Sequence, residues 1–272
     1  NQVIAMDEGP RAVRRKPNAS VKVAAQVVAN GDAAAFFSAG NTGATLIAAH
    51  SVFGMMPGVE RPALATTIPT RHRDAVLLDV GATIDCRPRH LLQFAAMGTV
   101  YAKKVLGIEN PRVGLLSIGE EAIKGNDLTR DAYQLLSDSR IQFIGNLEAR
   151  DLYGGDADVI VCDGFTGNVA LKVSEGLVEV VEDLLRDELN RTFTTQLGYL
   201  LSRRSYRRFR RRVDYSEYGG APLLGVAGLA VVGHGRSSTK AVRNALALTY
   251  RFVREGFVRS IDESMTSLDA ER

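Results

Sequence analysis

Short apolar runs alternate with longer segments whose apolar residues recur at helical spacing along most of this 272-residue chain. The runs predict strands, and the longer segments predict helices. The predicted strands cover residues 33–38, 75–80, 113–117, 142–145 and 158–162, and the predicted helices cover about 20–30, 43–54, 89–106, 128–137 and 168–189. Because strands alternate with helices, we expect an α/β fold with a mostly parallel sheet flanked by helices. We expect a single domain over residues 1–272, from which a helical segment at 171–212 protrudes.

The long helix leads into a strongly basic segment, Arg191–Arg212. The segment holds eight arginines and no lysine, aspartate or glutamate, so the net charge of +3 leaves 3 − 8 = −5 for the other residues. An apolar stripe beside an arginine-rich face is typical of a helix that lies on a membrane surface, and the same face suits an acidic protein partner. Dimer packing with a solvated face is an alternative. Nucleic acid is another, but no recognisable RNA-binding motif accompanies the arginines, so we expect no such partner. The residues expected to make the membrane or protein contact are Phe193, Leu197, Leu200, Leu201, Arg203, Arg204, Arg207, Arg208 and Arg211.

Composition places the chain among ordinary globular proteins. With 45% hydrophobic and 24% charged residues, it can bury a sizeable core. Cys86 and Cys162 lie far apart without a metal-type spacing, so we expect neither a disulfide framework nor a zinc site. No signal peptide or membrane-spanning run is evident, so we expect a cytoplasmic protein. The first residue is Asn1 rather than Met, and we expect the natural N-terminus to lie upstream.

Four loops that follow predicted strands carry glycine with small polar residues. In an open parallel sheet, ligands bind where such loops feed helix N-termini, whose free N–H groups suit an anion. Any one of these loops is more typical of a simple turn and helix cap, but the four together favour an anion site. Neither GxxxxGK[ST] nor a complete GxGxxG occurs, so a P-loop or dinucleotide site is a poor interpretation. The candidates for anion binding are Ser38, Gly40, Asn41, Thr42, Gly43, Asp79, Gly81, Gly164, Thr166, Gly167, Ser237 and Ser238.

Two further features suit chemistry on an anion. The stretch SIGEEAIKGND places Lys124 and Asn126 where they suit a phosphate or a developing oxyanion, whereas its acids are more typical of a solvated loop than of a metal site. We expect no metal. His234 lies between two glycines after an apolar run and suits either a general acid or a loop histidine bonded to backbone.

Several blocks resemble one protein family in the same order throughout. They read SAGNTGA, GVERPALATTIPT, LLDVGATIDCRPRHLLQFAAMG, YAKKVLGIENPRVGLLSIGEE, KGND, CDGFTGNVALK, DYSEYGGAPLLG and HGRSS. From Val3 to about Arg259 the chain resembles bacterial phosphate acyltransferase, the acyl-acyl-carrier-protein:phosphate acyltransferase of phospholipid synthesis. Members of that family open with a strand and loop reading Asp-Ala-Met-Gly-Gly-Asp and a further α/β unit, which are absent here.

The resemblance implies a fold like that of the isocitrate and isopropylmalate dehydrogenases and a homodimer. It implies transfer of a long-chain acyl group from acyl carrier protein to inorganic phosphate. We expect no cofactor. Phosphate is already a charged nucleophile and a thiolate is a fair leaving group, so the site must chiefly position groups and stabilise charge. On this basis we expect Asn41, Thr42 and Gly43, with Gly167 and Asn168, to hold phosphate or the acyl phosphate.

The remaining roles follow from the same resemblance. We expect Lys124 and Asn126 to face the carbonyl oxygen, Asp163 to orient a donor, and His234 to protonate the leaving thiol. The product would pass to a membrane acyltransferase, which fits reversible contact of the basic segment with an anionic membrane. The alternatives are a coenzyme A-dependent phosphate acetyl- or butyryltransferase, metal-dependent oxidative decarboxylation on the same fold, and a non-enzymatic membrane-associated scaffold.

Overall fold

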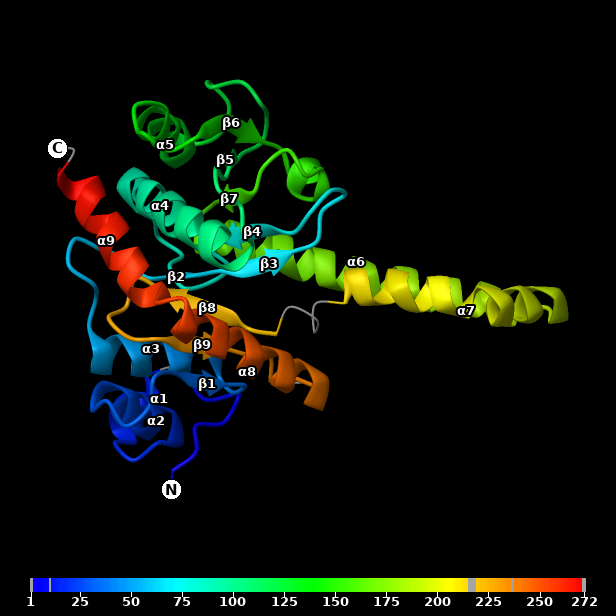
Figure 1. The fold of residues 1–272 in the computed structure, drawn as a ribbon, viewed down its shortest axis with the longest axis horizontal. Helices are drawn as coiled ribbons and strands as arrows, with labels where there is room; N and C mark the ends of the chain where they lie inside the picture. The colour runs from blue at the N-terminus through cyan, green and yellow to red at the C-terminus, as the bar shows by residue number, and fades with distance from the viewer. Residues whose placement is uncertain (1, 10, 215–218, 236, 271–272) are drawn as a thin grey trace.

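The computed structural model describes residues 2–9, 11–214, 219–235 and 237–270. Two sheets lie within a helical body, and a pair of long helices projects from that body as a hairpin (Figure 1). The flanking helices and the largely parallel pairing confirm the predicted α/β fold class. Arg236 of the HGRSS block, and residues 215–218 of the DYSEYGG block, lie outside the described residues.

The five-stranded sheet has the order β3-β4-β7-β5-β6 and is parallel except for its edge strand β3. The central strands β4, β5 and β7 are buried throughout, as continuous apolar runs predict for strands covered on both faces. Its strands are β3 (Thr66–Ile68), β4 (Ala75–Leu78), β5 (Val113–Leu116), β6 (Phe143–Leu147) and β7 (Val159–Val161).

The four-stranded sheet has the order β1-β9-β8-β2, with β1 and β9 parallel and the other pairs antiparallel. Only Ala65 separates β2 from β3, so one extended segment runs from this sheet into the other. Of the four strands, only β1 was predicted; β2, β8 and β9, like β3, were missed because they are two to four residues long and flanked by Gly or Pro. The strands are β1 (Phe36–Ser38), β2 (Ala63–Leu64), β8 (Ala221–Leu224) and β9 (Ala230–Val232).

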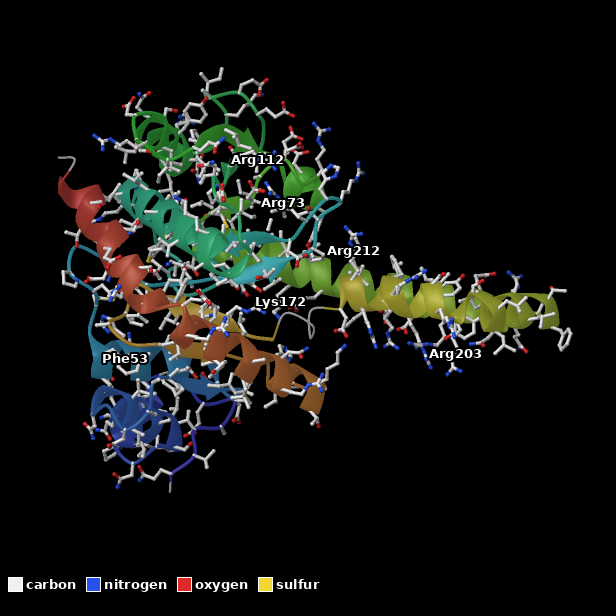
Figure 2. All side chains as sticks on the ribbon, viewed as in Figure 1. Phe53, Arg73, Arg112, Lys172, Arg203 and Arg212 are labelled. Atoms are coloured by element: carbon white, nitrogen blue, oxygen red, sulfur yellow. The ribbon has the colours of Figure 1, made fainter. Side chains whose placement is uncertain are left out.

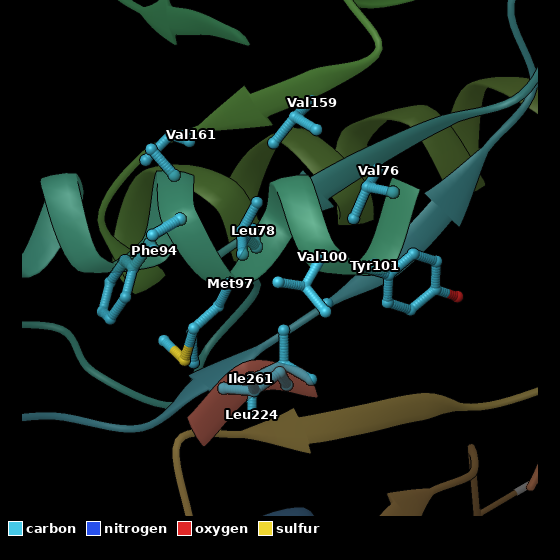
Figure 3. Close-up of a cluster of buried hydrophobic side chains, with 14 of the residues drawn as sticks. Val76, Leu78, Phe94, Met97, Val100, Tyr101, Val159, Val161, Leu224 and Ile261 are labelled. Carbon is cyan, nitrogen blue, oxygen red and sulfur yellow. The ribbon is translucent and has the colours of Figure 1, made fainter. Parts of the chain in front are cut away.

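Helix α4 lies across the five-stranded sheet and forms the centre of the core (Figure 3). It approaches the sheet closely because Gly98 has no side chain: a Cβ there would come within 2.5 Å of Val159 and 3.0 Å of Leu78. Met97 and Tyr101 of the same helix are fully buried. The shorter helical elements are α1 (Ala12–Arg15), α2 (Ser20–Ala29), α3 (Thr42–Phe53), α4 (Pro88–Val105), α5 (Asp127–Ser137), the 3-10 helix η1 (Ala149–Tyr153), α8 (Thr239–Arg254) and α9 (Phe257–Ala270).

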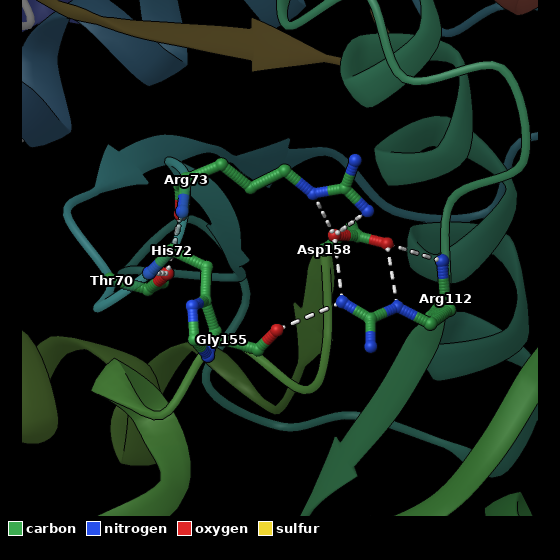
Figure 4. Close-up of polar contacts among 6 residues, drawn as sticks. All are labelled: Thr70, His72, Arg73, Arg112, Gly155 and Asp158. Atoms are coloured by element: carbon green, nitrogen blue, oxygen red, sulfur yellow. Dashed lines mark hydrogen bonds and ion pairs between the residues drawn. The ribbon is translucent and has the colours of Figure 1, made fainter.

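A buried carboxylate ties together the N-terminal ends of three parallel strands (Figure 4). Asp158, just before β7, accepts hydrogen bonds from Arg73 Nε at 2.9 Å and from the Arg112 backbone N and Nε at 2.9 and 3.1 Å. Burial opposes its charged form, but the hydrogen bonds from Arg112 prevail and hold its pKa below the usual value. The loops before β4, β5 and β7 are therefore fixed to one another.

The projecting hairpin consists of α6 (Gly164–Asn190) and α7 (Phe193–Val213), so the basic segment is helical as its apolar spacing predicts. The two helices run side by side in opposite directions (Figure 1), and Arg210 Nε lies 3.1 Å from Glu182 Oε2. Figure 2 shows Arg203 far out on the hairpin and Arg212 at its base. No helix among the described residues is long and apolar enough to cross a bilayer.

Candidate functional site

A cavity of about 780 Å³ runs along α6 where the two sheets meet. One wall is α6, and the opposite wall is the extended segment 64–71 with the ends of β8 and β9. Leu64, Ile68, Leu171 and Val178 make much of the wall apolar. The volume lies in the range of about 300–1,000 Å³ that is usual for small-molecule sites.

One end of the cavity is polar and gathers the carboxyl ends of strands from both sheets. Thr42, Asn168, Gly233, His234 and Ser237 line it, beside the N-termini of α3, α6 and α8. These residues were predicted from three separate loops, apart from Gly233, and the structure brings them together. Helix N-termini present unpaired N–H groups and the positive end of the helix dipole, so this end suits an anion.

Asn168 is the side chain best placed to meet a ligand at this end. It is exposed in the first turns of α6, and no hydrogen bond to its carboxamide is present among the described residues. Gly81 of the neighbouring loop packs against it: a Cβ at that position would lie 3.7 Å from Asn168 Cβ and Cγ, in ordinary contact, and glycine is favoured there by the positive φ of 127°. An amide side chain in this position can donate to a phosphate oxygen or to a developing oxyanion.

Helix α3 contributes its first backbone N–H groups. The Asn41 side chain caps the helix by accepting from Ala44 N at 3.0 Å, and its Nδ2 donates to Glu8 O at 2.9 Å. Both polar atoms of Asn41 are thus engaged with the chain itself. The N–H groups of Thr42 and Gly43, in the first turn, have no partner within the helix, and of these two residues Thr42 lines the cavity whereas Gly43 does not. Neither Ser38, which accepts from Thr45 Oγ1 at 3.0 Å, nor Gly40 lines the cavity.

The predicted polar residues at other helix starts also serve as caps. For these residues the structure therefore shows the helix cap that the sequence analysis weighed against an anion site. Asp163 accepts from the backbone of Phe165 and Thr166 and from the Thr166 hydroxyl at 2.7 Å, so it orients that hydroxyl group. The other two caps are Ser238, which accepts from Ala241 N at 3.2 Å, and Asn126, which accepts from Thr129 N at 2.9 Å.

Asp79 is a support for the loop rather than a phosphate ligand, which corrects its predicted role. The side chain is fully buried and accepts four backbone N–H groups, from Leu64, Gly81, Ala82 and Thr83, at 2.6–3.0 Å. Burial raises the pKa of Asp79 to about 6, although these hydrogen bonds oppose the rise. With its oxygens occupied, the carboxylate holds the 79–83 loop in shape beside Asn168.

Gly164 and Gly167 let α6 approach that loop, and their amides do not face a ligand. Gly164 N donates to Thr83 O at 2.9 Å, and Gly167 N donates to Asp163 O at 3.0 Å. A Cβ at Gly164 would lie 2.7 Å from Asp79 Oδ2, and one at Gly167 would overlap the Asp79 carbonyl oxygen. Their predicted contact with phosphate is therefore replaced by a packing role.

Lys124 and Asn126 lie outside the cavity, on the 117–126 loop after β5. The loop is held by Asn146 Nδ2, which donates to Glu121 O at 2.9 Å, and Lys124 is exposed. Their contact with the carbonyl oxygen stays a prediction. Within the described part of the chain, no three His, Cys, Asp or Glu side chains are grouped to hold a metal.

The far end of the cavity was missed by the sequence analysis. Thr70, Arg71, Tyr153, Phe209 and Arg212 line it, and they come from three distant segments. Phe209 and Arg212 belong to the basic segment but lie outside the set predicted for membrane or protein contact. A signal for the α6 wall was present, because Asn168, Leu171, Glu175 and Val178 recur at helical spacing on one face.

The outer part of the hairpin carries the residues predicted for membrane or protein contact. Leu201 and Phe193 are each 80% exposed, although large apolar side chains are usually buried. The arginines that follow are exposed as well. The whole predicted set is Phe193, Leu197, Leu200, Leu201, Arg203, Arg204, Arg207, Arg208 and Arg211, and every member is exposed.

Comparison with known proteins identifies the relatives of the chain. Residues 1–260 match a protein-family model described as Fatty acid synthesis protein. A phosphate acyltransferase from Acidobacterium capsulatum is 51% identical over 260 residues, which cover 95% of this chain and 77% of that protein. Among solved structures, a phosphotransacetylase from Streptococcus pyogenes superposes with a TM-score of 0.56 at 17% identity, covering 86% of this chain and 67% of that one. For 4-hydroxythreonine-4-phosphate dehydrogenase from Klebsiella pneumoniae the TM-score is 0.50 at 11% identity, covering 86% and 68%. The two structures show the shared fold.

Proposed function

The chain belongs to the phosphate acyltransferase family, and we propose that its cavity binds a long-chain acyl group of acyl carrier protein and transfers it to inorganic phosphate. The observation that carries this proposal is the shape of the site: an apolar channel along α6 ends at a polar pocket of helix N-termini. A fatty acyl chain with a reacting carbonyl at one end has the same division between apolar and polar parts.

Phosphate binds at the polar end in this proposal. The N–H groups of Thr42 and Gly43 and the Asn168 carboxamide supply donors, and the dipoles of α3 and α6 favour the negative charge. Ser237 adds a hydroxyl group at the rim. These groups are fixed on helices before the substrate arrives, so little reorganisation is required at the moment of reaction.

The reaction then requires one bond to form and one to break. A phosphate oxygen attacks the thioester carbonyl carbon, and the carbon–sulfur bond breaks to release the thiolate of the carrier protein. Hydrogen phosphate brings one proton, which ends on the departing sulfur, so acyl phosphate and free thiol balance the reactants. His234 lies on the polar end and is the candidate for relaying that proton. Neither Cys86 nor Cys162 lines the cavity, and burial raises the pKa of the Cys86 thiol to about 12 and that of the Cys162 thiol well above its usual value, so this proposal uses neither as a nucleophile.

The exposed side chains of the hairpin support contact with an anionic membrane and with acyl carrier protein. Its exposed leucines suit the interfacial region of a bilayer and its arginines suit anionic lipid, each worth on the order of 1 kcal/mol near such a surface. We infer a cytoplasmic enzyme that binds the membrane reversibly and passes its product to a membrane acyltransferase. The same arginines suit the acidic surface of acyl carrier protein.

An apolar stripe on α6 fits a second copy of the chain. Phe165, Val169, Val173 and Leu184 recur at helical spacing and are exposed. Such a stripe is stabilised when a partner helix covers it, so we propose a homodimer that packs through α6.

The experiment is to trap acyl phosphate with hydroxylamine as the hydroxamate. Palmitoyl-acyl carrier protein with phosphate should give hydroxamate that disappears when phosphate is left out, and acetyl-coenzyme A should give far less. Equal or greater product from acetyl-coenzyme A would favour the short-chain alternative. If neither donor gives phosphate-dependent product, the proposed function is wrong.

A further inference from the structure

We infer that Phe209 and Arg212, at the base of α7, limit the length of the acyl chain that the cavity accepts. The inference rests on the proposed function, because it places the acyl chain in the cavity. Phe209 acts by contact with the end of the chain, and Arg212 is a positioning residue that holds the end wall closed.

The geometry of α6 gives the length of the channel. The helix lines the cavity from Asn168 at the polar end to Val178, ten positions further along. At a rise of about 1.5 Å per residue, this wall is about 15 Å long. Phe209 lines the end near Val178, because the 3.1 Å ion pair between Arg210 and Glu182 fixes this turn of α7 beside α6.

Hydrogen bonds close the end wall around Phe209. Arg212 Nη2 donates to Thr70 O at 2.8 Å and to Arg71 O at 2.9 Å. Arg71 N in turn donates to Tyr153 O at 3.0 Å. The Arg212 guanidinium group therefore fastens the base of α7 to the loop between β3 and β4, and a backbone hydrogen bond fastens that loop to η1. Figure 2 shows Arg212 where the hairpin meets the body.

The length of an extended acyl chain, compared with the length of the channel, shows how the end wall limits the substrate. An extended chain advances about 1.2 Å per bond, so about a dozen bonds lie along α6 before the chain reaches the wall. Carbons beyond that point meet the ring of Phe209. The ring is 49% exposed, so it separates the channel from solvent with little protein behind it. Removing the ring should extend the channel outwards, and enlarging it should shorten the channel.

The test measures kcat/KM by hydroxamate trapping with lauroyl-, myristoyl-, palmitoyl- and stearoyl-acyl carrier protein. Phe209→Ala should raise the ratio of stearoyl to lauroyl rates by about fourfold for each methylene group newly buried. Phe209→Trp should lower the ratio. Arg212→Lys should weaken the preference for one length, because an ammonium group cannot reproduce the planar contact with both carbonyl groups.

A matched control lies on the same helix. Tyr199 is an exposed aromatic residue of α7 that does not line the cavity, and Tyr199→Ala should leave the ratio unchanged. Melting temperatures show that each variant is folded. An active wild type whose chain-length ratio is unchanged in both Phe209 variants would overturn this inference and leave the proposed function standing. A wild type that makes no acyl phosphate from any donor would overturn the proposed function itself.

Discussion

Replacing Asn168 with alanine should slow acyl transfer by weakening the hold on phosphate. The carboxamide is exposed at the polar end of the cavity, so alanine removes a donor without leaving a buried group unpaired. A hydrogen bond to a charged group contributes about 1.5–3 kcal/mol, which corresponds to a loss of roughly 10- to 150-fold in kcat/KM for phosphate.

The fold should tolerate this change. Alanine has a higher helix propensity than asparagine, and exposed substitutions usually alter stability by no more than about 0.5 kcal/mol. For a domain of this size, that shift in stability moves the melting temperature by about 1–2 °C. A loss of activity with an unchanged melting temperature is therefore attributable to the site.

The assay is the initial rate of hydroxamate formation with phosphate varied at a fixed, saturating concentration of palmitoyl-acyl carrier protein. Asn190→Ala is the matched control, because it removes the same side chain at the other end of α6. A rise in the phosphate KM indicates lost ground-state binding, and a fall in kcat indicates a contact made in the transition state. If kcat/KM for phosphate is the same in Asn168→Ala as in the wild type, Asn168 does not belong to the phosphate site.

Three further predictions concern stability and the membrane. The pKa of Asp79 is raised from 3.8 to about 6, so the folded protein keeps a proton that the unfolded chain has released between these values. The free energy of unfolding should therefore fall by about 3 kcal/mol as pH rises through that window. Urea titrations of Asp79→Asn should lack this decrease. A difference in free energy of unfolding between wild type and variant that stays constant with pH would contradict this prediction. Asp158→Asn removes the buried charge that Arg73 and Arg112 bind and should cost about 1.5–3 kcal/mol in the same experiment, since both arginines are partly exposed and stay solvated; a loss below about 0.5 kcal/mol would show that the cluster matters little. Leu201→Glu should reduce sedimentation with anionic vesicles at least about tenfold, whereas Leu246→Glu, an exposed leucine on α8, should not; equal binding by both variants would place the membrane contact elsewhere.

The sequence predicted the parts of the fold that apolar spacing controls. The five predicted strands correspond to β1, β4, β5, β6 and β7, and the central strands β4, β5 and β7 are the clearest apolar runs. β2 and β3, which run from one sheet into the other, and β8 and β9 of the four-stranded sheet are short runs bounded by Gly or Pro, which favour turns in a sequence. Their pairing is fixed by contacts between distant segments, such as β2 with β8.

The sequence predicted residues at the polar end of the candidate site but none at its far end. Strand-end loops of small polar residues mark the polar end, and Thr42, Asn168, His234 and Ser237 do line one cavity. The sequence could not separate side chains that face the cavity from those that cap a helix, because the same residue types do both. The far end is built by tertiary contacts alone, as when Arg212 reaches a loop 141 positions away along the chain.

In the proposed function, the acyl chain lies in the channel along α6, with its carbonyl group at the polar end. The most direct measurement is photocrosslinking with acyl carrier protein carrying a palmitoyl chain that has a diazirine at its far end, followed by mass spectrometry of the peptides. We expect labelling of the end wall, at residues 68–71, 153 and 209–213, and protection of these peptides by unlabelled palmitoyl-acyl carrier protein. Labelling confined to the outer hairpin or to the 117–126 loop would contradict it.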